Sequence, residues 1–365
     1  MKMLISAYAC EPNKGSEPEV GWRWMIRFSK ECDELTVVTR KNNRKNIEEE
    51  FCKLNIDNVV FKYFDLPQWV SFWKKGGRGV NLYAYLWEIS LFFYLLKRYN
   101  KNHFDNAQRV TFVAYKFPSF IWYFANKFTL GPIAGGERFP FSFLKVFSFK
   151  GKIKEIVRML LQRISLLDPF ILLTFYKASK IIAVTDDTKS ILPRFARKKT
   201  IIEPAISIDV NDFDLNKKES CNRVKESPIR LLYVGNLLEW KGIGLVLLAL
   251  KDVERNKYDF SIVGSGPDEK IFKDYVVENN LKVNFLGQKT RKELSEFYLT
   301  HDLFVFPSLH DSGGMVVLEA KAHGLPVVVS CFGGPKMFVT DTDEIISERD
   351  SVDKFIKELK AAIIR

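Results

Sequence analysis

Two acidic side chains near the C-terminal end have the type and spacing to bind a polar ligand. Asp311 lies in a polar, glycine-containing loop, Ser308 to Gly314, and Glu319 follows with seven residues between the two acids. A short apolar run, Leu303 to Phe306, predicts a buried parallel strand before the loop, and Met315 to His323 predicts a helix after it. Ligands bind at the carboxyl ends of such strands, so we expect both acids at a binding edge.

Other glycine-bearing loops also follow expected strands. They contain Gly15–Ser16, Gly135–Gly136, Gly235–Gly242, Gly264–Gly266 and Gly313–Gly314. If two doubly wound domains face each other, these loops converge on one cleft. Lys241 is then placed to pair with a phosphate, and Glu319 to accept both hydroxyls of a ribose. The backbone N–H groups of Gly313 to Val316 are placed to hold a sugar or phosphate oxygen.

Each of these features also has an ordinary interpretation. The Gly15–Ser16 loop lacks the GxGxxG spacing of a nucleotide-binding loop, so taken alone it is better interpreted as an ordinary turn in which Ser16 caps the following helix. Asp311 alone could cap a helix, and Glu319 could be a solvated helical residue. The sequence Asp341-Thr342-Asp343 matches the Asp-x-Asp pattern of metal-dependent sugar transferases, but its polar, acidic surroundings favour a solvated loop. The four histidines show no metal-ligand spacing, so we expect no metal.

Length and composition predict an intracellular α/β protein of two domains. A chain of 365 residues is long for a single core, and we place the domains at 1–205 and 206–365. The five cysteines are scattered and lack CxxC spacing, which favours a reducing compartment. The N-terminal apolar run is too short for a secretory signal, and no apolar stretch could span a bilayer. We therefore expect a cytoplasmic location.

The positive charge is concentrated in the first half. Residues 1–204 carry 34 Lys and Arg against 19 Asp and Glu, whereas residues 205–365 carry 22 against 25. Such a half attracts phosphates, anionic lipids or nucleic acid, and the chain has no nucleic-acid recognition motif. The aromatic and basic segment Trp69 to Arg78 is interpreted as a membrane or acceptor loop, and Tyr83 to Tyr99 as a core helix. Peripheral contact with the inner face of a membrane through this half is therefore expected.

Strands and helices alternate along the chain, most regularly in the second half, which indicates doubly wound domains. The strands expected in the first half are Lys2–Ala9, Leu35–Thr39, Val59–Phe64, Gln108–Val113, Lys180–Thr185 and Lys198–Glu203. Those expected in the second are Ile229–Val234, Phe260–Val263, Val283–Leu286, Leu303–Phe306 and Val327–Ser330. A polar stretch, Asn211 to Pro228, is expected to be a loop at the domain boundary.

Five motifs of the second half, in this order and spacing, resemble the retaining glycosyltransferases of family four. They are LLYVGNLLEWKG (231–242), FSIVGSGPDEK (260–270), VNFLGQKTRKELSEFY (283–298), FVFPSLHDSGGMVVLEAKAHGLPVVVS (304–330) and GGP (333–335). AYACEPNKGSEPEVGW (7–22) and VTFVAYKFPSF…GPIAGGERFP (110–140) resemble a subgroup of the same family. The resemblance implies the GT-B fold, in which two Rossmann-like domains face each other across a cleft.

The resemblance also implies a function: retaining, metal-independent transfer of a sugar from a nucleotide-sugar donor to a glycan or lipid-linked acceptor in bacterial surface-polysaccharide synthesis. The nucleotide sugar is a substrate, so no cofactor is expected. Asp311 corresponds to the acid that contacts the donor sugar, Glu319 to the acid on the ribose, and Lys241 to the lysine at the diphosphate. Further donor-side positions are Gly15, Ser16, Asn236, Gly264, Gly266, Ser312, Gly313, Gly314, Met315 and Val316. Acceptor-side candidates are Gln108, Arg109, Gly136 and Glu137.

Three residues depart from the family pattern. Asn236 stands where an arginine is expected beside the diphosphate, Gln108 where relatives tend to carry His, and Asp311 where Glu is more usual. Relatives also usually continue beyond the position of Gly334 with helices that cross back to the first domain. The loss of a cation and of a candidate base leaves an alternative open: a catalytically impaired homologue that binds a nucleotide or a partner.

Overall fold

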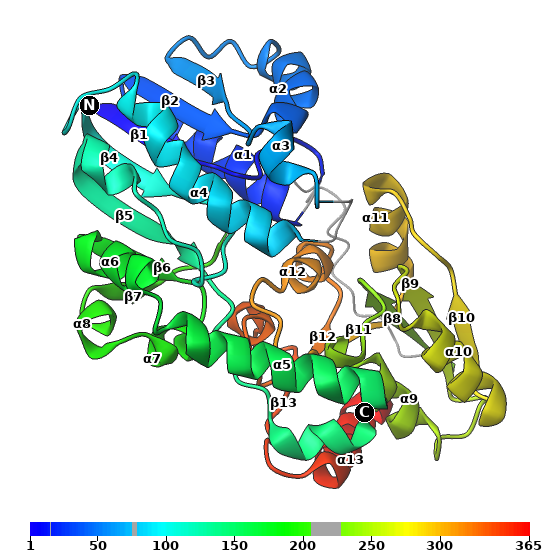
Figure 1. Ribbon diagram of the computed structural model, residues 1–365. Coiled ribbons are helices and arrows are strands. Elements are labelled where there is room, and N and C mark those ends of the chain that lie inside the picture. Colours follow the sequence, from blue (N-terminus) through cyan, green and yellow to red (C-terminus); the bar gives the residue numbers. More distant parts are fainter. Residues whose placement is uncertain (15, 75–78, 206–227) are drawn as a thin grey trace. The chain divides into compact units, whose positions relative to one another are not determined.

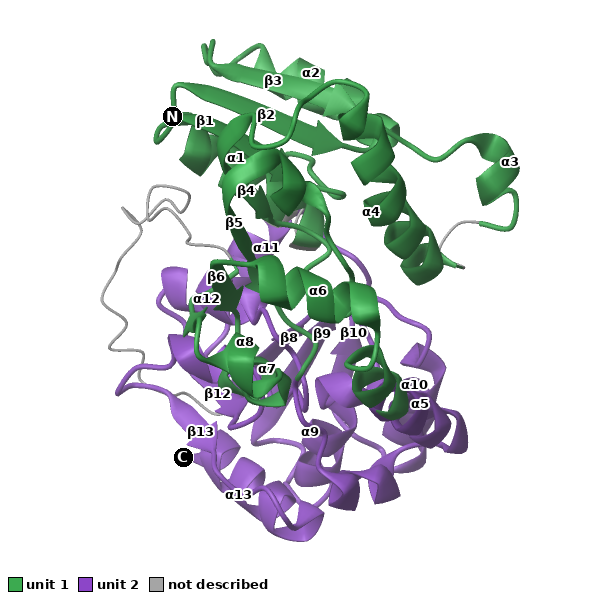
Figure 2. Ribbon diagram, turned by 60° about the vertical axis from the view of Figure 1, so that its left-hand side comes forward, with its two compact units in different colours: residues 1–136, 160–207 green, residues 137–159, 208–365 purple. Residues whose placement is uncertain are grey.

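The structure is a computed structural model that describes residues 1–14, 16–74, 79–205 and 228–365 (Figure 1). The chain divides into two compact units (Figure 2). The first comprises residues 1–136 and 160–207, and the second comprises residues 137–159 and 208–365. Each unit has its own parallel sheet and its own apolar core, so the predicted pair of Rossmann-like domains is confirmed. The predicted boundary between residues 205 and 206 lies at the edge of the described residues.

The sheet of the first unit has the strand order β3-β2-β1-β4-β5-β6-β7, with every neighbouring pair parallel. Its strands are β1 (Lys2–Ser6), β2 (Glu34–Thr39), β3 (Val59–Tyr63), β4 (Phe104–Arg109), β5 (Ala125–Ile133), β6 (Lys180–Ala183) and β7 (Thr200–Ile202). Its helices are α1 (Ser16–Ser29), α2 (Arg44–Phe51), α3 (Gln68–Ser71), α4 (Val80–Leu96), α6 (Pro169–Lys177), α7 (Asp186–Ile191) and α8 (Arg194–Arg197). Since β1 leads to β2 and β4 leads to β5, the winding direction reverses between β1 and β4.

The sheet of the second unit has the order β10-β9-β8-β11-β12-β13, again all parallel. Its strands are β8 (Ile229–Val234), β9 (Tyr258–Val263), β10 (Val283–Phe285), β11 (Leu303–Phe306), β12 (Val327–Ser330) and β13 (Glu344–Ile346). Its helices include α9 (Ile243–Leu250), α10 (Glu269–Glu278), α11 (Arg291–Thr300), α12 (Met315–Ala322) and α13 (Val352–Ile364). This strand order is that of the Rossmann fold, and its winding reverses between β8 and β11.

Residues 137–159 belong to the second unit, although the sequence places them in the first half. Three phenylalanines explain this difference, because Phe139, Phe143 and Phe147 are buried in the core of the second unit. The ring of Phe143 packs edge-on against Phe332 and Phe355, with centroid separations of 5.7 and 5.2 Å. The segment continues into α5 (Phe149–Ser165), and the division between the units falls within this helix.

Most predicted elements are confirmed, and the main differences have local causes. Helix α1 begins at Ser16, the residue expected to cap it. Pro18 is tolerated there because the first turn of a helix needs no N–H donor, and Gly21 lets α1 approach the carbonyl of Ala9. Strand β4 ends at Arg109, so the predicted strand Gln108–Val113 lies too late. Strand β13 was not predicted, because its three residues follow an acidic turn.

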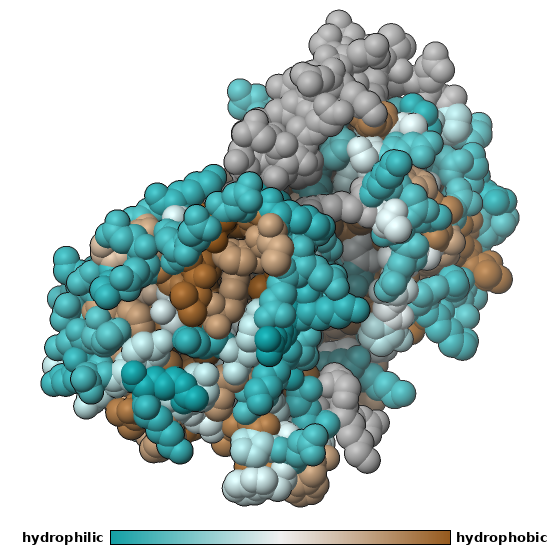
Figure 3. Space-filling view, turned by 90° about the horizontal axis from the view of Figure 1, so that it is seen from above, coloured by the Kyte–Doolittle hydropathy of each residue, from teal (hydrophilic) through white to brown (hydrophobic). Residues whose placement is uncertain are grey.

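The described residues contain no helix that is both long and apolar enough to cross a membrane. Helix α4 is the predicted core helix, and it buries Trp87, Leu91 and Leu95 against the sheet. Apolar side chains also reach the surface, and Figure 3 shows them on one face in patches framed by hydrophilic residues. In the predicted membrane or acceptor loop, Trp69 and Phe72 are 79 and 77% exposed, while residues 75–78 lie outside the described part of the chain.

A carboxyl group and a guanidinium group are buried together where the winding of the first sheet reverses. Glu88 of α4 and Arg109 of β4 are 2 and 1% exposed, and Ser6 donates a hydrogen bond to Glu88 at 3.3 Å. Burial raises the pKa of Glu88 to about 7, against the opposing effects of Arg109 and nearby hydroxyls. Arg109 donates to the carbonyls of Phe117 and Ala114 at 3.1 and 3.4 Å.

The raised pKa of Glu88 predicts a pH-dependent stability. The folded protein retains the Glu88 proton up to about pH 7, whereas the unfolded chain releases it near 4.5, so unfolding becomes easier as the pH rises through this window. Glu88→Gln removes this contribution. We expect wild type to lose about 3 kcal/mol of unfolding free energy relative to the variant between pH 4.5 and 7.5. Urea unfolding measures it, with exposed Glu48→Gln as control, and a difference constant with pH would contradict it.

Candidate functional site

The candidate site lies at the carboxyl end of β8 and β11, where the winding of the second sheet reverses. The loop after β8 carries Gly235 to Gly242, and the loop after β11 carries Pro307 to Gly314. The two loops are joined by a hydrogen bond from the Leu309 N–H to the Trp240 carbonyl, at 2.9 Å. In doubly wound sheets this position is the usual ligand site. It brings Lys241 and Asp311, which the sequence predicted for the same site, into contact.

Lys241 and Asp311 form an ion pair between Nζ and Oδ2, with side chains 15 and 14% exposed. The other carboxylate oxygen of Asp311, Oδ1, accepts the N–H groups of Gly313 and Gly314 at 3.0 and 3.3 Å. Asp311 therefore accepts three hydrogen bonds. The Lys241 ammonium also lies 4.5 Å from the ring centroid of Trp240 and 5.1 Å from that of Phe306.

These contacts keep Asp311 ionised. Burial acts to raise the pKa of Asp311, but the charge of Lys241 and the three hydrogen bonds outweigh it, so the pKa lies below its ordinary value. Asp311 is therefore present as a carboxylate at neutral pH. A buried carboxylate without its cation would be costly, so each member depends on the other.

Glycines allow the loop after β12 to lie against the Asp311 loop. Gly333 has φ +68°, and a side chain there would overlap the Asp311 carbonyl, while one on Gly334 would overlap the Ser312 carbonyl. The Gly334 N–H donates to the Asp311 carbonyl at 2.7 Å. Gly314, with φ +59°, approaches Pro335 in the same way. The predicted motif Gly333-Gly334-Pro335 thus packs directly against the backbone of the Asp311 loop.

Gly264 and Gly266 play a similar part after β9. A side chain on Gly264 would overlap the Gly235 carbonyl, and one on Gly266 would overlap the backbone of Leu237. The Leu237 N–H donates to the Ser265 carbonyl at 3.0 Å. These predicted donor-side glycines therefore let the loops after β8 and β9 pack backbone to backbone.

Glu319 is positioned by α12 and fixed by a tyrosine. The Tyr298 hydroxyl of α11 donates to Glu319 Oε2 at 3.1 Å, and Tyr298 itself is 1% exposed. The Tyr298 ring stacks on His323, whose Nδ1 lies 2.8 Å from the Glu319 carbonyl oxygen. The sequence predicted Glu319 but not Tyr298, since a tyrosine in an amphipathic helix gives no signal beyond burial.

A second set of side chains supports the Lys241 and Asp311 loops, and the sequence did not identify it. His310 stacks on Trp240 at a centroid distance of 4.2 Å, and its Nε2 lies 3.1 Å from Oε1 of Glu155 in α5. Burial lowers the pKa of His310, so the neutral ring donates to the Glu155 carboxylate. Arg158 also binds that carboxylate at 2.8 Å. Because Glu155 is far away in the sequence, only the fold reveals this link.

Segment 137–159 makes a further bond to the site through Glu239. The N–H and hydroxyl groups of Ser148 donate to the Glu239 carboxylate at 2.5 and 2.6 Å. The Glu239 N–H in turn donates to Asp268 at 3.0 Å. Gly151 allows this approach, because a side chain there would overlap the Glu239 carboxylate.

The remaining donor-side candidates differ in their surroundings. Asn236 is exposed at the carboxyl end of β8, where its carbonyl accepts the Tyr233 hydroxyl at 3.2 Å. Met315 and Val316 open α12, so their N–H groups have no partner within the helix. Ser16 is the first residue of α1, and Gly15 lies outside the described residues.

The acceptor-side candidates make contacts in the interior of the two units. The Gln108 side chain, 5% exposed, donates to the Gly131 carbonyl at 2.8 Å. Arg109 is buried beside Glu88, as described above. Gly136 lies against Thr188, whose hydroxyl accepts the Gly136 N–H at 3.1 Å. Glu137 is 3% exposed, and its carbonyl accepts from Arg158 at 3.4 Å in the second unit.

The Asp-x-Asp sequence has a structural role that the predicted solvated loop does not describe. The side chain of Asp343 is fully buried, binds Lys321 at 2.6 Å and accepts the N–H groups of Val327 and Thr340 at 2.9 and 2.8 Å. Asp341 is exposed, as predicted. Among the described residues, no three His, Cys, Asp or Glu side chains gather as metal ligands would.

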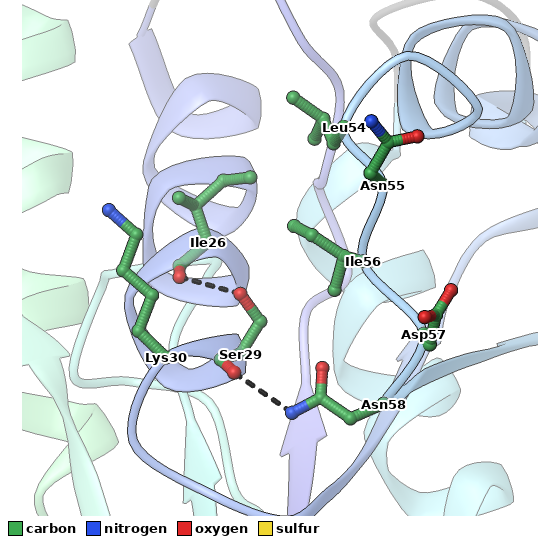
Figure 4. A pocket seen from close by; sticks show the side chains of 8 residues that line it. All are labelled: Ile26, Ser29, Lys30, Leu54, Asn55, Ile56, Asp57 and Asn58. Carbon is green, nitrogen blue, oxygen red and sulfur yellow. Dashed lines mark hydrogen bonds between the residues drawn. The ribbon is translucent and has the colours of Figure 1, made fainter.

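A hollow of about 540 Å³ lies elsewhere, at the amino-terminal edge of the first sheet (Figure 4). It lies between the end of α1 and the chain before β3. Its lining residues are Ile26, Ser29, Lys30, Leu54, Asn55, Ile56, Asp57 and Asn58. Asn58 closes it by donating to the Ser29 and Cys32 carbonyls at 2.8 and 2.7 Å. This edge carries none of the predicted site residues.

The site loops and helix α12 lie within a stretch of the chain that matches a known protein family. Residues 216–364 match the family model described as glycosyl transferases group 1. These residues form a glycosyl transferases group 1 domain. The match contains the Lys241–Asp311 pair and Glu319, so all three predicted residues lie within the matched part of the chain.

Relatives and solved structures agree with this group 1 domain. An uncharacterised glycosyltransferase of Methanocaldococcus jannaschii is 33% identical over 174 residues, which are 44% of this chain and 45% of the relative. UDP-Gal:alpha-D-GlcNAc-diphosphoundecaprenol alpha-1,3-galactosyltransferase of Escherichia coli is 29% identical over 179 residues, which are 44 and 46% of the two chains. Such matches span only 31 to 53% of the length of five curated relatives.

The likeness in fold extends over the whole chain. Sucrose-phosphate synthase from Thermosynechococcus elongatus superposes with a TM-score of 0.63 and 18% identity, covering 100% of this chain and 89% of that structure. This similarity concerns the fold, which is of the GT-B type that the sequence predicted.

The close approach of Gly333 to Asp311 predicts that alanine at Gly333 costs more stability than alanine at Gly324. Gly333 and Gly324 have nearly the same backbone angle, φ +68° and +71°, but nothing lies near Gly324. Gly324→Ala should cost about 1 kcal/mol of unfolding free energy from backbone strain alone. Gly333→Ala adds the overlap with the Asp311 carbonyl, so we expect it to cost at least about 2 kcal/mol more. Urea unfolding measures both, and equal costs would refute the role assigned to Gly333.

Proposed function

We propose that the protein is a glycosyltransferase that moves a sugar from a nucleotide-sugar donor to a polysaccharide or lipid-linked acceptor. The observation that carries this proposal is the Lys241–Asp311 pair at the reversal point of the second sheet, inside the group 1 domain. A cation held there, beside a helix N-terminus, suits a diphosphate. Glu319 lies on the same helix, α12, is fixed by Tyr298 of α11, and suits the ribose hydroxyls.

Hydrogen-bonding groups of the site remain available for such a ligand. Lys241 has three N–H donors, and its bond to Asp311 uses one of them. Asp311 uses three of about four acceptor positions, which leaves one for a hydroxyl of the donor sugar. The first N–H groups of α12, at Met315 and Val316, are assigned to phosphate or sugar oxygens.

We propose retention of configuration and independence from metals. Lys241 and the α12 N-terminus would stabilise the leaving diphosphate, which is the electrostatic contribution expected to dominate the rate. Gly15 and Ser16 are assigned to the donor side, as the family resemblance implies. The product's anomeric configuration by NMR, and activity in the presence of EDTA, test these two statements.

We place the acceptor at the cytoplasmic face of a membrane. The Escherichia coli relative is named for a UDP-sugar donor and a diphosphoundecaprenol-linked acceptor, and we propose the same substrate classes here. The net positive charge of residues 1–204 supports an acceptor that carries phosphate.

A second proposal rests on Gln108 and Asn236. Gln108 is buried on the Gly131 carbonyl, and Asn236 supplies no cation, so a nucleotide-binding homologue without transfer activity fits these residues. Donor binding with no transfer to any lipid-linked or glycan acceptor would favour it. Turnover by wild type at an ordinary rate would exclude it.

Donor binding predicts a thermal shift. A panel of UDP-, GDP- and ADP-sugars should contain one donor that, at about 100 times its Kd, raises the melting temperature by about 5 °C or more. Glu319→Gln keeps an acceptor for Tyr298 but removes the charge, so it should weaken this donor at least about tenfold, with unfolding unchanged in its absence. Glu296→Gln, also on the α11–α12 side of the unit, is the control.

Lys241→Met should abolish the shift, and Lys241→Arg should retain part of it. Lys241→Arg is included because Lys241→Met leaves Asp311 unpaired, whereas arginine keeps a cation beside it. If no nucleotide sugar changes the melting temperature of wild type, the proposed function fails.

A further inference from the structure

Helix α5 has two faces of opposite character, and Figure 1 shows it as one continuous helix. One face holds the site: Glu155 binds His310, and Gly151 lies against Glu239. The other face is apolar and uncovered. Its residues are Phe149, Ile153, Ile156, Val157, Leu160, Leu161 and Ile164, with exposed fractions between 43 and 78%. At 3.6 residues per turn these seven form one stripe along the helix.

Basic residues line both borders of this apolar stripe. At the same helical spacing, Lys152 and Arg163 fall along one border and Lys154 along the other, with Lys150 between Val157 and Leu161 on that second side. The helix contains five Lys and Arg and a single acid. That acid, Glu155, lies on the inward face, where Arg158 and His310 bind it. On this outward face Lys154 lies 3.8 Å from Asp268 of the same unit, whereas Lys150, Lys152 and Arg163 have no compensating carboxylate on their own helix.

We propose that the outward face of α5 binds the surface of an anionic lipid bilayer. A helix of this kind lies in the plane of the interface, with its apolar stripe among the acyl chains and its Lys and Arg at the headgroup phosphates. Charge on both borders matches a surface of phosphates on either side of the helix. A second copy of the chain fits less well, because pairing through the stripe would bring the basic borders of two helices together.

The inward face of α5 links lipid binding to the candidate site. The same helix that meets the lipid holds His310, next to Asp311, through Glu155. Lipid binding would therefore keep the loops of the group 1 domain near the membrane surface, where a lipid-linked acceptor resides. The membrane contact itself does not depend on sugar transfer, so the two proposals fail separately.

Flotation of the full chain with lipid vesicles tests the inference. Wild type should float with vesicles of phosphatidylcholine and phosphatidylglycerol and remain behind with phosphatidylcholine alone. Leu160→Glu and Ile153→Glu place a charge in the stripe, and each should weaken binding at least about tenfold. Val277→Glu is the matched control, because Val277 is an aliphatic residue of α10 that is 80% exposed outside the stripe. It should bind as wild type does.

A double variant tests the basic residues beside the stripe. Lys152→Glu with Arg163→Glu should reduce binding by more than about tenfold at low salt, and less at high salt, where screening already weakens the headgroup attraction. Leu160→Trp adds a reporter at the centre of the stripe. Its fluorescence should shift to shorter wavelength with anionic vesicles and be quenched by brominated acyl chains.

Two results would overturn the proposal. One is equal vesicle binding by Leu160→Glu and Val277→Glu, provided both variants melt at the wild-type temperature. The other is a wild-type dimer in sedimentation that Leu160→Glu dissociates, with no effect of lipid, which would assign the stripe to a second copy.

Discussion

The candidate site depends on one buried ion pair, that of Lys241 and Asp311. Two loops that follow different strands supply its members, so the pair fixes one loop against the other. An isolated charge at this depth would cost several kcal/mol, and the N–H groups of Gly313 and Gly314 satisfy the carboxylate oxygen that Lys241 does not reach. The glycines around the pair follow from it, because the backbone must come close enough to cradle Asp311.

The side chains that support this pair come from distant parts of the sequence. Trp240 and His310 flank Lys241 and Asp311 in the chain and stack on each other, and Glu155 holds the histidine. Glu319 has a separate support in Tyr298 and His323. Rigid aromatic neighbours of this kind limit the movement of charged groups, so the site is largely formed before any ligand arrives.

The sequence predicted those parts of the molecule whose signals are local. Strands β8, β11 and β12 have the predicted bounds, because short apolar runs with Gly or Pro next to one end are distinctive. Asp311, Glu319 and Lys241 were identified from loop position and family resemblance. Glu155, Ser148 and Tyr298 were not, because their roles depend on tertiary contacts. Gln108 and Arg109 were assigned to an acceptor site, yet their side chains are buried by the sheet around them. Asp343 was interpreted as solvated, and its capping of Val327 could not be foreseen from an acidic turn.

The second unit is discontinuous along the chain, since Phe139, Phe143 and Phe147 complete a core whose other residues follow β7. During synthesis these rings leave the ribosome well before Phe332 and Phe355, and they stay exposed until the last strands and α13 are made. Folding of the second unit must therefore wait until the segment through α13 has been made, and the nascent chain carries an exposed apolar segment until then. For the same reason, a protein cut between residues 205 and 206 would separate the group 1 domain from part of its own core.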